Sequence, residues 1–70
     1  MAHRHVGIVK TVLPGKGFGF IKSDVDGAEY FFHYSGCSGV KFDELQIGTR
    51  VSFIERASAK GPRAEAIERA

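Results

Sequence analysis

The sequence contains no tryptophan, a single cysteine and only two prolines among its 70 residues. With Cys37 alone the chain cannot form an internal disulfide, which favours a reducing compartment. No apolar run approaches the roughly 18 residues that a membrane-spanning helix needs. The first residues, MAHRHVG, also lack the apolar stretch of a secretory signal. We therefore expect a cytoplasmic protein that does not associate with membranes.

A chain of this length forms one domain, which we place at residues 1–70, with residues 1–4 as a frayed N-terminus. Its formal net charge is +2, which permits a polyanionic partner without identifying one. The distribution of charge is more informative than the total. Lys10, Lys16 and Lys22 lie in the first third of the chain, close to the aromatic residues, whereas the acidic residues lie mainly further along.

Strand patterns are stronger than helix patterns in this sequence. HVGIVKTVL at 5–13, KGFGFIK at 16–22, AEYFFHYS at 28–35 and TRVSFIER at 49–56 each predict a strand. The last segment, RAEAIER at 63–69, has helical propensity, but its alternation favours a strand, as does the edge that four strands would leave unpaired. We therefore predict an all-β domain in which five short strands form a closed or nearly closed barrel.

The run KGFGFIK predicts aromatic rings that face water. Residues two apart in a strand share a face. Phe18 and Phe20 therefore share a face with Lys16 and Lys22, and a face that carries two lysines is not the core. The glycines between them allow the strand to coil tightly in a barrel wall.

The second aromatic run, YFFHYSG, divides in the same way. Phe31 and His33 share one face, and because His33 is the more polar we place both on the wet side. Tyr30 and Phe32 then fill the barrel. If the two runs pair as a hairpin, their wet faces form one patch of rings bordered by lysines.

Exposed rings flanked by cations suit single-stranded nucleic acid. Each unpaired base that stacks on a ring contributes about 1–3 kcal/mol, with little dependence on sequence. Lysines along the strand pair with phosphates and release counterions. A duplex, whose bases are already stacked, gains nothing from such a surface.

These runs and their flanks resemble the cold-shock domain. KGFGFI matches the first ribonucleoprotein motif, and YFFHYSG is similar to the second motif of bacterial cold-shock proteins. GIVK, GTRVSF and AKGPRA extend the resemblance along nearly the whole chain. In RNA-recognition-motif domains the two motifs occur in the opposite order and two helices are required, so the order here favours the cold-shock family. The resemblance implies an OB-fold barrel of five antiparallel strands.

The same resemblance implies a protein that binds single-stranded RNA or DNA with low sequence preference and acts as an RNA chaperone. It implies no catalysis, cofactor, metal or small-molecule substrate, and a monomer or weak dimer. Carried over position by position, the nucleic-acid-binding residues are Lys10, Lys16, Phe18, Phe20, Phe31, His33, Tyr34, Phe42, Lys60 and Arg63.

One departure from the family supports an alternative. Family members usually carry a tryptophan and a second aromatic residue where this chain has Thr11 and Val12. Each lost stacking contact weakens binding by roughly 5- to 150-fold. The alternative is a barrel of the same fold with weak or lost nucleic-acid binding, whose exposed rings contact a protein partner or a second copy.

Three other constellations are rejected. His3, His5 and His33 lack the cysteine pair or helical spacing of a metal site. Cys37 lies four residues from His33, but no orienting acid or oxyanion donor accompanies this pair. The glycines at 15, 17 and 19 do not have the spacing of a dinucleotide-binding fingerprint.

Overall fold

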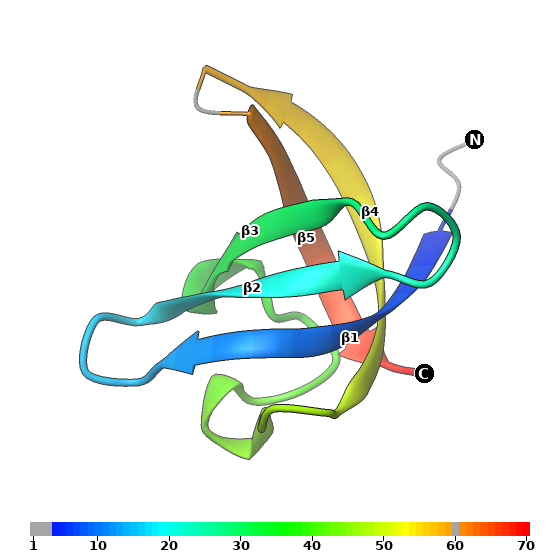
Figure 1. Ribbon diagram of the computed structural model, residues 1–70. Helices are drawn as coiled ribbons and strands as arrows, with labels where there is room; N and C mark the ends of the chain where they lie inside the picture. The colour runs from blue at the N-terminus through cyan, green and yellow to red at the C-terminus, as the bar shows by residue number, and fades with distance from the viewer. Residues whose placement is uncertain (1–3, 60) are drawn as a thin grey trace.

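The computed structural model describes residues 4–59 and 61–70. Its strands are β1 Arg4–Leu13, β2 Phe18–Ser23, β3 Glu29–His33, β4 Arg50–Ser58 and β5 Gly61–Arg69. Two short 3₁₀ helices, η1 Tyr34–Gly36 and η2 Phe42–Glu44, lie in the connection between β3 and β4 (Figure 1). Arg4, which we expected in a frayed terminus, is instead the first residue of β1. Residues 1–3, the rest of that predicted terminus, lie outside the described residues.

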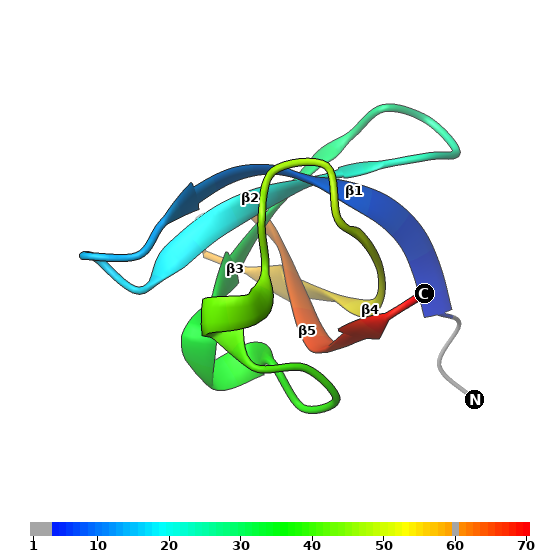
Figure 2. The ribbon, with the colours of Figure 1, turned by 90° about the horizontal axis from the view of Figure 1, so that it is seen from below.

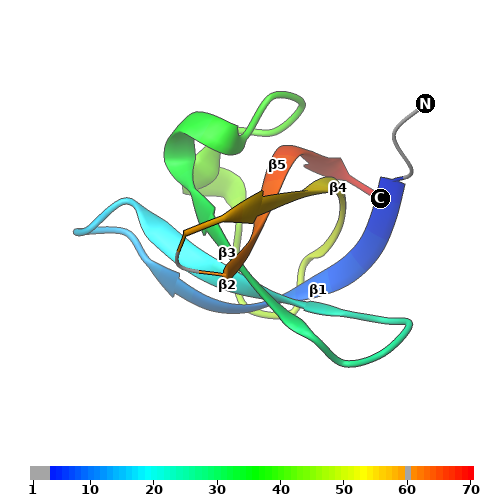
Figure 3. The same cartoon turned by 90° about the horizontal axis from the view of Figure 1, so that it is seen from above.

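The strands close into a barrel in the order β1-β2-β3-β5-β4. Figure 2 and Figure 3, from below and from above, show β1, β2 and β3 as one curved layer that the β4–β5 hairpin crosses. The predicted five-stranded all-β barrel is confirmed, and segment 63–69 is a strand. Four of the pairings are antiparallel, whereas β3 closes on β5 in parallel, with Phe31 opposite Arg63.

The core forms from side chains that point inward from the strands, together with Leu45 from the connection between β3 and β4. It comprises Val9, Ile21, Tyr30, Phe32, Leu45, Val51, Phe53, Ala64 and Ile67. Tyr30 and Phe32 fill the barrel as predicted. Full burial of a ring such as that of Phe32 contributes about 1.5–3 kcal/mol. Gly19 makes room for this ring, because a Cβ there would lie 2.9 Å from the Phe32 ring and 2.2 Å from the Thr11 carbonyl oxygen.

Two β-bulges decide which side chains reach the outer wall. In β1 the register shifts between Val9 and Thr11, so that Thr11 lies opposite Phe20. In β5 the shift lies at Ala66, which has a φ of 51°. A bulge inserts one residue into a strand, and Ala64 and Ile67 can therefore both point into the core. The uninterrupted alternation predicted for segment 63–69 is wrong beyond this point.

Candidate functional site

Three phenylalanine rings lie side by side on the outer wall of β2 and β3. Phe20 is directly opposite Phe31, and Phe18 is opposite His33 in the antiparallel pair. The centroids of the three phenylalanine rings are 5.5 to 6.3 Å apart. All three residues lie outside the core cluster, as the period-two pattern predicted. They are half-buried, however, and less exposed than that pattern predicted. We call Phe18, Phe20 and Phe31 the aromatic platform.

His33 and Tyr34 extend the aromatic surface beyond the end of β3. Their ring centroids are 4.2 Å apart, and Tyr34 is 57% exposed. The Ser35 backbone N–H donates to His33 Nδ1, and the Ser35 hydroxyl lies 2.9 Å from the same nitrogen. His33 thus caps η1, which fixes the orientation of its imidazole. Because Nδ1 accepts the bond from the Ser35 backbone N–H, a neutral His33 ring carries its proton on Nε2.

The turn that joins β1 to β2 supports Tyr34. Its last residue, Gly17, has a φ of 75°, and a Cβ there would lie 2.8 Å from Tyr34 Cδ2. Any larger residue would therefore push the tyrosine ring away. Lys16 lies in this turn, where it is exposed, so its predicted place in the same strand as Phe18 is wrong.

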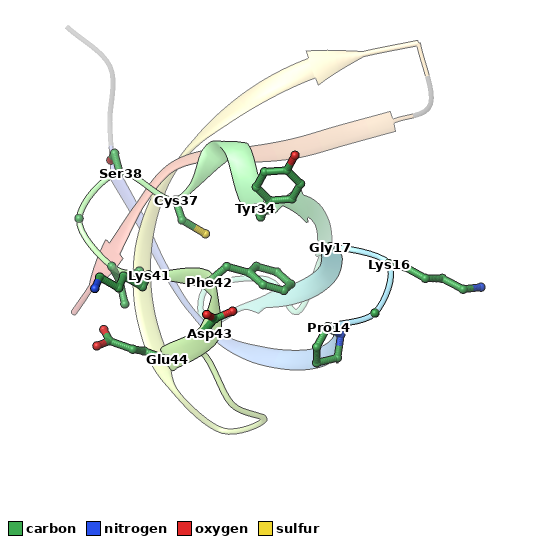
Figure 4. Close-up of a pocket in the computed structure, with 13 residues that line it drawn as sticks. Pro14, Lys16, Gly17, Tyr34, Cys37, Ser38, Lys41, Phe42, Asp43 and Glu44 are labelled. Atoms are coloured by element: carbon green, nitrogen blue, oxygen red, sulfur yellow. The ribbon is translucent and has the colours of Figure 1, made fainter.

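Phe42 lies in η2 and contacts both the core and a surface pocket. Its ring centroid is 5.9 Å from that of Phe32, and it packs against the core cluster. The pocket, of about 880 Å³, is lined by the turn at 14–17, by Tyr34 and by residues 37–44. Figure 4 shows the rings of Tyr34 and Phe42 at this pocket, with the Cys37 sulfur directed toward them. Burial raises the pKa of the Cys37 thiol.

The lysines predicted around the platform differ in how far a neighbouring carboxylate already neutralises their charge. Lys22 is exposed on β2. Lys10 forms an ion pair with the Glu29 carboxylate. The hydrogen bond from Lys10, reinforced by its charge, holds the pKa of Glu29 below its usual range. Part of the positive charge of Lys10 is therefore already compensated in the free protein.

Arg63 brings a cation from β5 to the platform. Its guanidinium carbon is 5.8 Å from the ring centroid of Phe31, the residue opposite it. A groove of about 530 Å³ is lined by Phe20, Phe31, Ser58, Ala59, Gly61, Pro62 and Arg63. This groove joins the platform to the β4–β5 turn. Lys60, also predicted to bind nucleic acid, lies outside the described residues.

The two positions that depart from the family pattern lie on different faces of β1. Thr11 lies opposite Phe20 beside the platform, whereas Val12 packs against the core. Of these two positions, only Thr11 therefore lies on the outer wall. Leu13, opposite Phe18 and 37% exposed, adds an apolar side chain there that the sequence pattern did not predict.

The residues of the rejected constellations have structural contacts or lie outside the described part of the chain. The His5 ring stacks on Phe53, with its Nε2 3.6 Å from the Glu55 carboxylate, and His3 is outside the described residues. Among residues 4–59 and 61–70, no group of three or more His, Cys, Asp or Glu side chains is placed to hold a metal ion. Within the same residues, no helix has the length and apolar character needed to cross a membrane.

Comparison with known proteins gives a consistent family match. The profile of a family described as "'Cold-shock' DNA-binding domain" matches residues 5–70. The chain is 44% identical over 61 residues to the cold shock protein ScoF of Streptomyces coelicolor, covering 87% of this chain and 91% of that protein. It is 37% identical over 68 residues to the major cold shock protein CspA of Pseudomonas aeruginosa, covering 97% of each. A solved structure, Drosophila Unr CSD456, shares the fold, with a TM-score of 0.79 at 23% identity over 99% of this chain and 27% of that one.

Proposed function

The chain belongs to the cold-shock domain family, whose barrel is a nucleic-acid-binding fold, and from this premise we propose that it is an RNA chaperone that binds single strands. The observation that carries the proposal is the aromatic platform. Its three rings lie within 6.3 Å of one another on the outer wall and outside the core.

Bases of a single strand stack on the platform rings, while nearby cations pair with the phosphates. Each stacked base contributes about 1–3 kcal/mol, and each base-pair step of a duplex contributes about 1.4 kcal/mol. Stacking on three rings therefore offsets the free energy of a few base-pair steps. This range is enough to keep short mispaired helices open, and too little to melt long ones. The chaperone action thus requires binding energy alone, with no catalytic step.

The proposed contacts combine the platform with the aromatic and basic residues around it. They are Lys10, Lys16, Phe18, Phe20, Phe31, His33, Tyr34, Phe42, Lys60 and Arg63. The partner is single-stranded RNA or DNA, bound with low sequence preference in the cytoplasm by a monomer or weak dimer. The proposed function uses no cofactor and no small-molecule substrate.

The proposal is tested by titrating a labelled thymine-rich oligonucleotide into the protein and into the Phe20→Ala and Phe31→Ala variants, at two salt concentrations. Each substitution should weaken binding by roughly 5- to 150-fold, because it removes one stacking ring. Ile47→Ala is the matched control, since Ile47 is a 73% exposed apolar residue outside the platform. Equal affinity for the platform variants and the control would refute the proposal, as would tighter binding of a duplex of the same length.

A second candidate function follows from the outer face of β1. Thr11 stands where a ring would extend the platform, and Leu13 and Ile8 are each more than one third exposed on this strand. These features suit an apolar contact with a protein partner or with a second copy. Sedimentation across a concentration series separates the two functions, because self-association without uptake of the oligonucleotide supports the second.

A further inference from the structure

A row of directly opposed residues runs around the outer wall from β1 to β4. The opposed pairs are Thr11 with Phe20, Phe20 with Phe31, Phe31 with Arg63, and Arg63 with Arg56. Opposed residues project to the same side of a sheet. Neighbouring strands are about 4.8 Å apart, so Arg56 lies roughly 10 Å from Phe31 along this row. Two aromatic rings are thus followed directly by two arginines.

The carboxylate of Glu65, which is opposite Ile54 on β4, contacts both of these arginines. Its Oε1 is 2.8 Å from Arg56 Nε, and its Oε2 is 3.4 Å from Arg63 Nε. Arg63 Nε is buried and has no hydrogen-bond partner among the described residues, since its contact with Glu65 is an ion pair without hydrogen-bond geometry. A buried donor without an acceptor is destabilising. Among the described residues of the free protein, the Nε–H of Arg63 is therefore left without a hydrogen-bond acceptor.

We propose that Arg56 and Arg63 form a binding site for a backbone phosphate of the single strand, and that Glu65 occupies this site in the free protein. The inference rests on the proposed function and adds Arg56 and Glu65 to its binding surface. Carboxylate and phosphate oxygens fit the same planar fork of guanidinium donors. Glu65 thus takes the position of the phosphate until a strand arrives.

The geometry allows the exchange with little rearrangement. The Arg56 side chain is 69% exposed, so a phosphate reaches it from solvent. Arg63 keeps its position beside the Phe31 ring, where a cation and an aromatic face attract each other. A base stacked on Phe31 places its own phosphate within reach of this guanidinium. The two arginines and one glutamate leave one net positive charge to attract that phosphate.

Glu65 therefore lowers both the affinity for single strands and the dependence of binding on salt. Each phosphate that a protein neutralises on a single strand adds about 0.7 to the slope of log affinity against log salt. Removal of the Glu65 charge exposes a second uncompensated arginine at the site. The free carboxylate is thus an internal competitor that sets how tightly the strand is held.

The test compares Glu65→Gln and Arg56→Gln with the matched control Glu68→Gln, by titration of a labelled thymine-rich strand over a series of salt concentrations. Glu68 is on the same strand and lies 4.0 Å from an arginine, but that residue is Arg4, away from the platform. Glu65→Gln should bind roughly two- to five-fold more tightly at low salt, with a slope steeper by about 0.7. Arg56→Gln should bind more weakly with a shallower slope, and Glu68→Gln should keep the wild-type slope.

The outcomes separate this inference from the proposed function. If Phe31→Ala weakens binding but Glu65→Gln behaves like Glu68→Gln, the phosphate site is refuted and the function stands. If Glu65→Gln only lowers the thermal unfolding temperature and leaves the salt slope unchanged, Glu65 is a structural residue and the inference also fails. If the wild-type protein binds no single strand at all, the function and the inference are refuted together.

A second readout does not depend on the oligonucleotide. In ¹⁵N spectra of Glu65→Gln, inorganic phosphate should shift the Nε–Hε signals of Arg56 and Arg63 more than those of Arg4. The wild-type protein should show smaller shifts at the same phosphate concentration, because Glu65 competes. Equal shifts at all arginine side chains would overturn the inference.

Discussion

Replacing Thr11 with tryptophan should increase the affinity for single strands. Thr11 lies opposite Phe20 on the outer wall, about 4.8 Å away across the strand pair. An indole there falls within the 4.5–7 Å at which aromatic rings pack against each other. The platform would then extend from β2 and β3 onto β1 and accept one more base.

The size of the effect follows from one added stacking contact. A base stacked on a ring contributes about 1–3 kcal/mol. Part of the indole will pack against Phe20 and Leu13, so we expect the lower part of this range, a roughly 5- to 30-fold gain. Thr11 is half-buried on the outer wall and is not part of the core. The free energy of unfolding should therefore change by less than about 0.5 kcal/mol.

The assay combines oligonucleotide titration with indole emission, which is unambiguous because the native chain has no tryptophan. Val25→Trp is the control, since Val25 is 84% exposed in the turn between β2 and β3, outside the platform. Thr11→Trp should bind more tightly and lose emission on binding, while Val25→Trp should do neither. A folded Thr11→Trp variant with unchanged affinity would refute stacking on this wall, and so would an equal gain in the control.

Three further predictions concern the barrel itself. Ala66→Gly should raise the free energy of unfolding by about 0.5–1 kcal/mol, because glycine tolerates the positive φ at this bulge. Ala66→Val should lower the free energy of unfolding. Chemical denaturation measures both, and a stabilised valine variant would contradict the prediction. Because Lys10 lowers the pKa of Glu29, their pair stabilises the fold above the usual glutamate range and loses that effect as pH falls through the lowered pKa. Lys10→Gln should therefore raise the Glu29 titration midpoint in carboxyl NMR, and an unmoved midpoint would count against the pair. Burial raises the pKa of Cys37, so its alkylation at mildly alkaline pH should be slower in the folded than in the denatured protein, and equal rates would be the contrary result.

Much of the barrel follows from local patterns in the sequence. The period-two alternation placed Phe18, Phe20 and Phe31 on the wall and Tyr30 and Phe32 inside, and the structure agrees. This works because β2 and β3 pair without a register shift, so that strand parity alone decides the face. The fifth strand was also predicted correctly, because four strands alone would have left an unpaired edge.

The bulges could not be predicted, since a bulge depends on the register with a partner strand. Position 66 is an alanine and not a glycine, so the sequence does not indicate the positive φ there. The shift next to Lys10 places Thr11 outward and Val12 inward, which sequence alone did not distinguish. The extent of the turn before β2 was also missed, and with it the position of Lys16.

The ion pairs on the wall have no local signature either. Lys10 and Glu29 are 19 positions apart, and Glu65 meets Arg56 only because β4 pairs with β5. Such contacts arise from strand order and decide which cations remain available to a ligand. The sequence therefore predicted the rings of the candidate site better than its charges.

Stacking itself is tested most directly by NMR of the phenylalanine rings during addition of a thymine-rich single strand. We predict that ring protons of Phe18, Phe20 and Phe31 move upfield under the ring current of the bound bases, while those of the buried Phe32 and Phe53 stay in place. Unchanged platform signals at saturating strand would contradict the proposed binding surface.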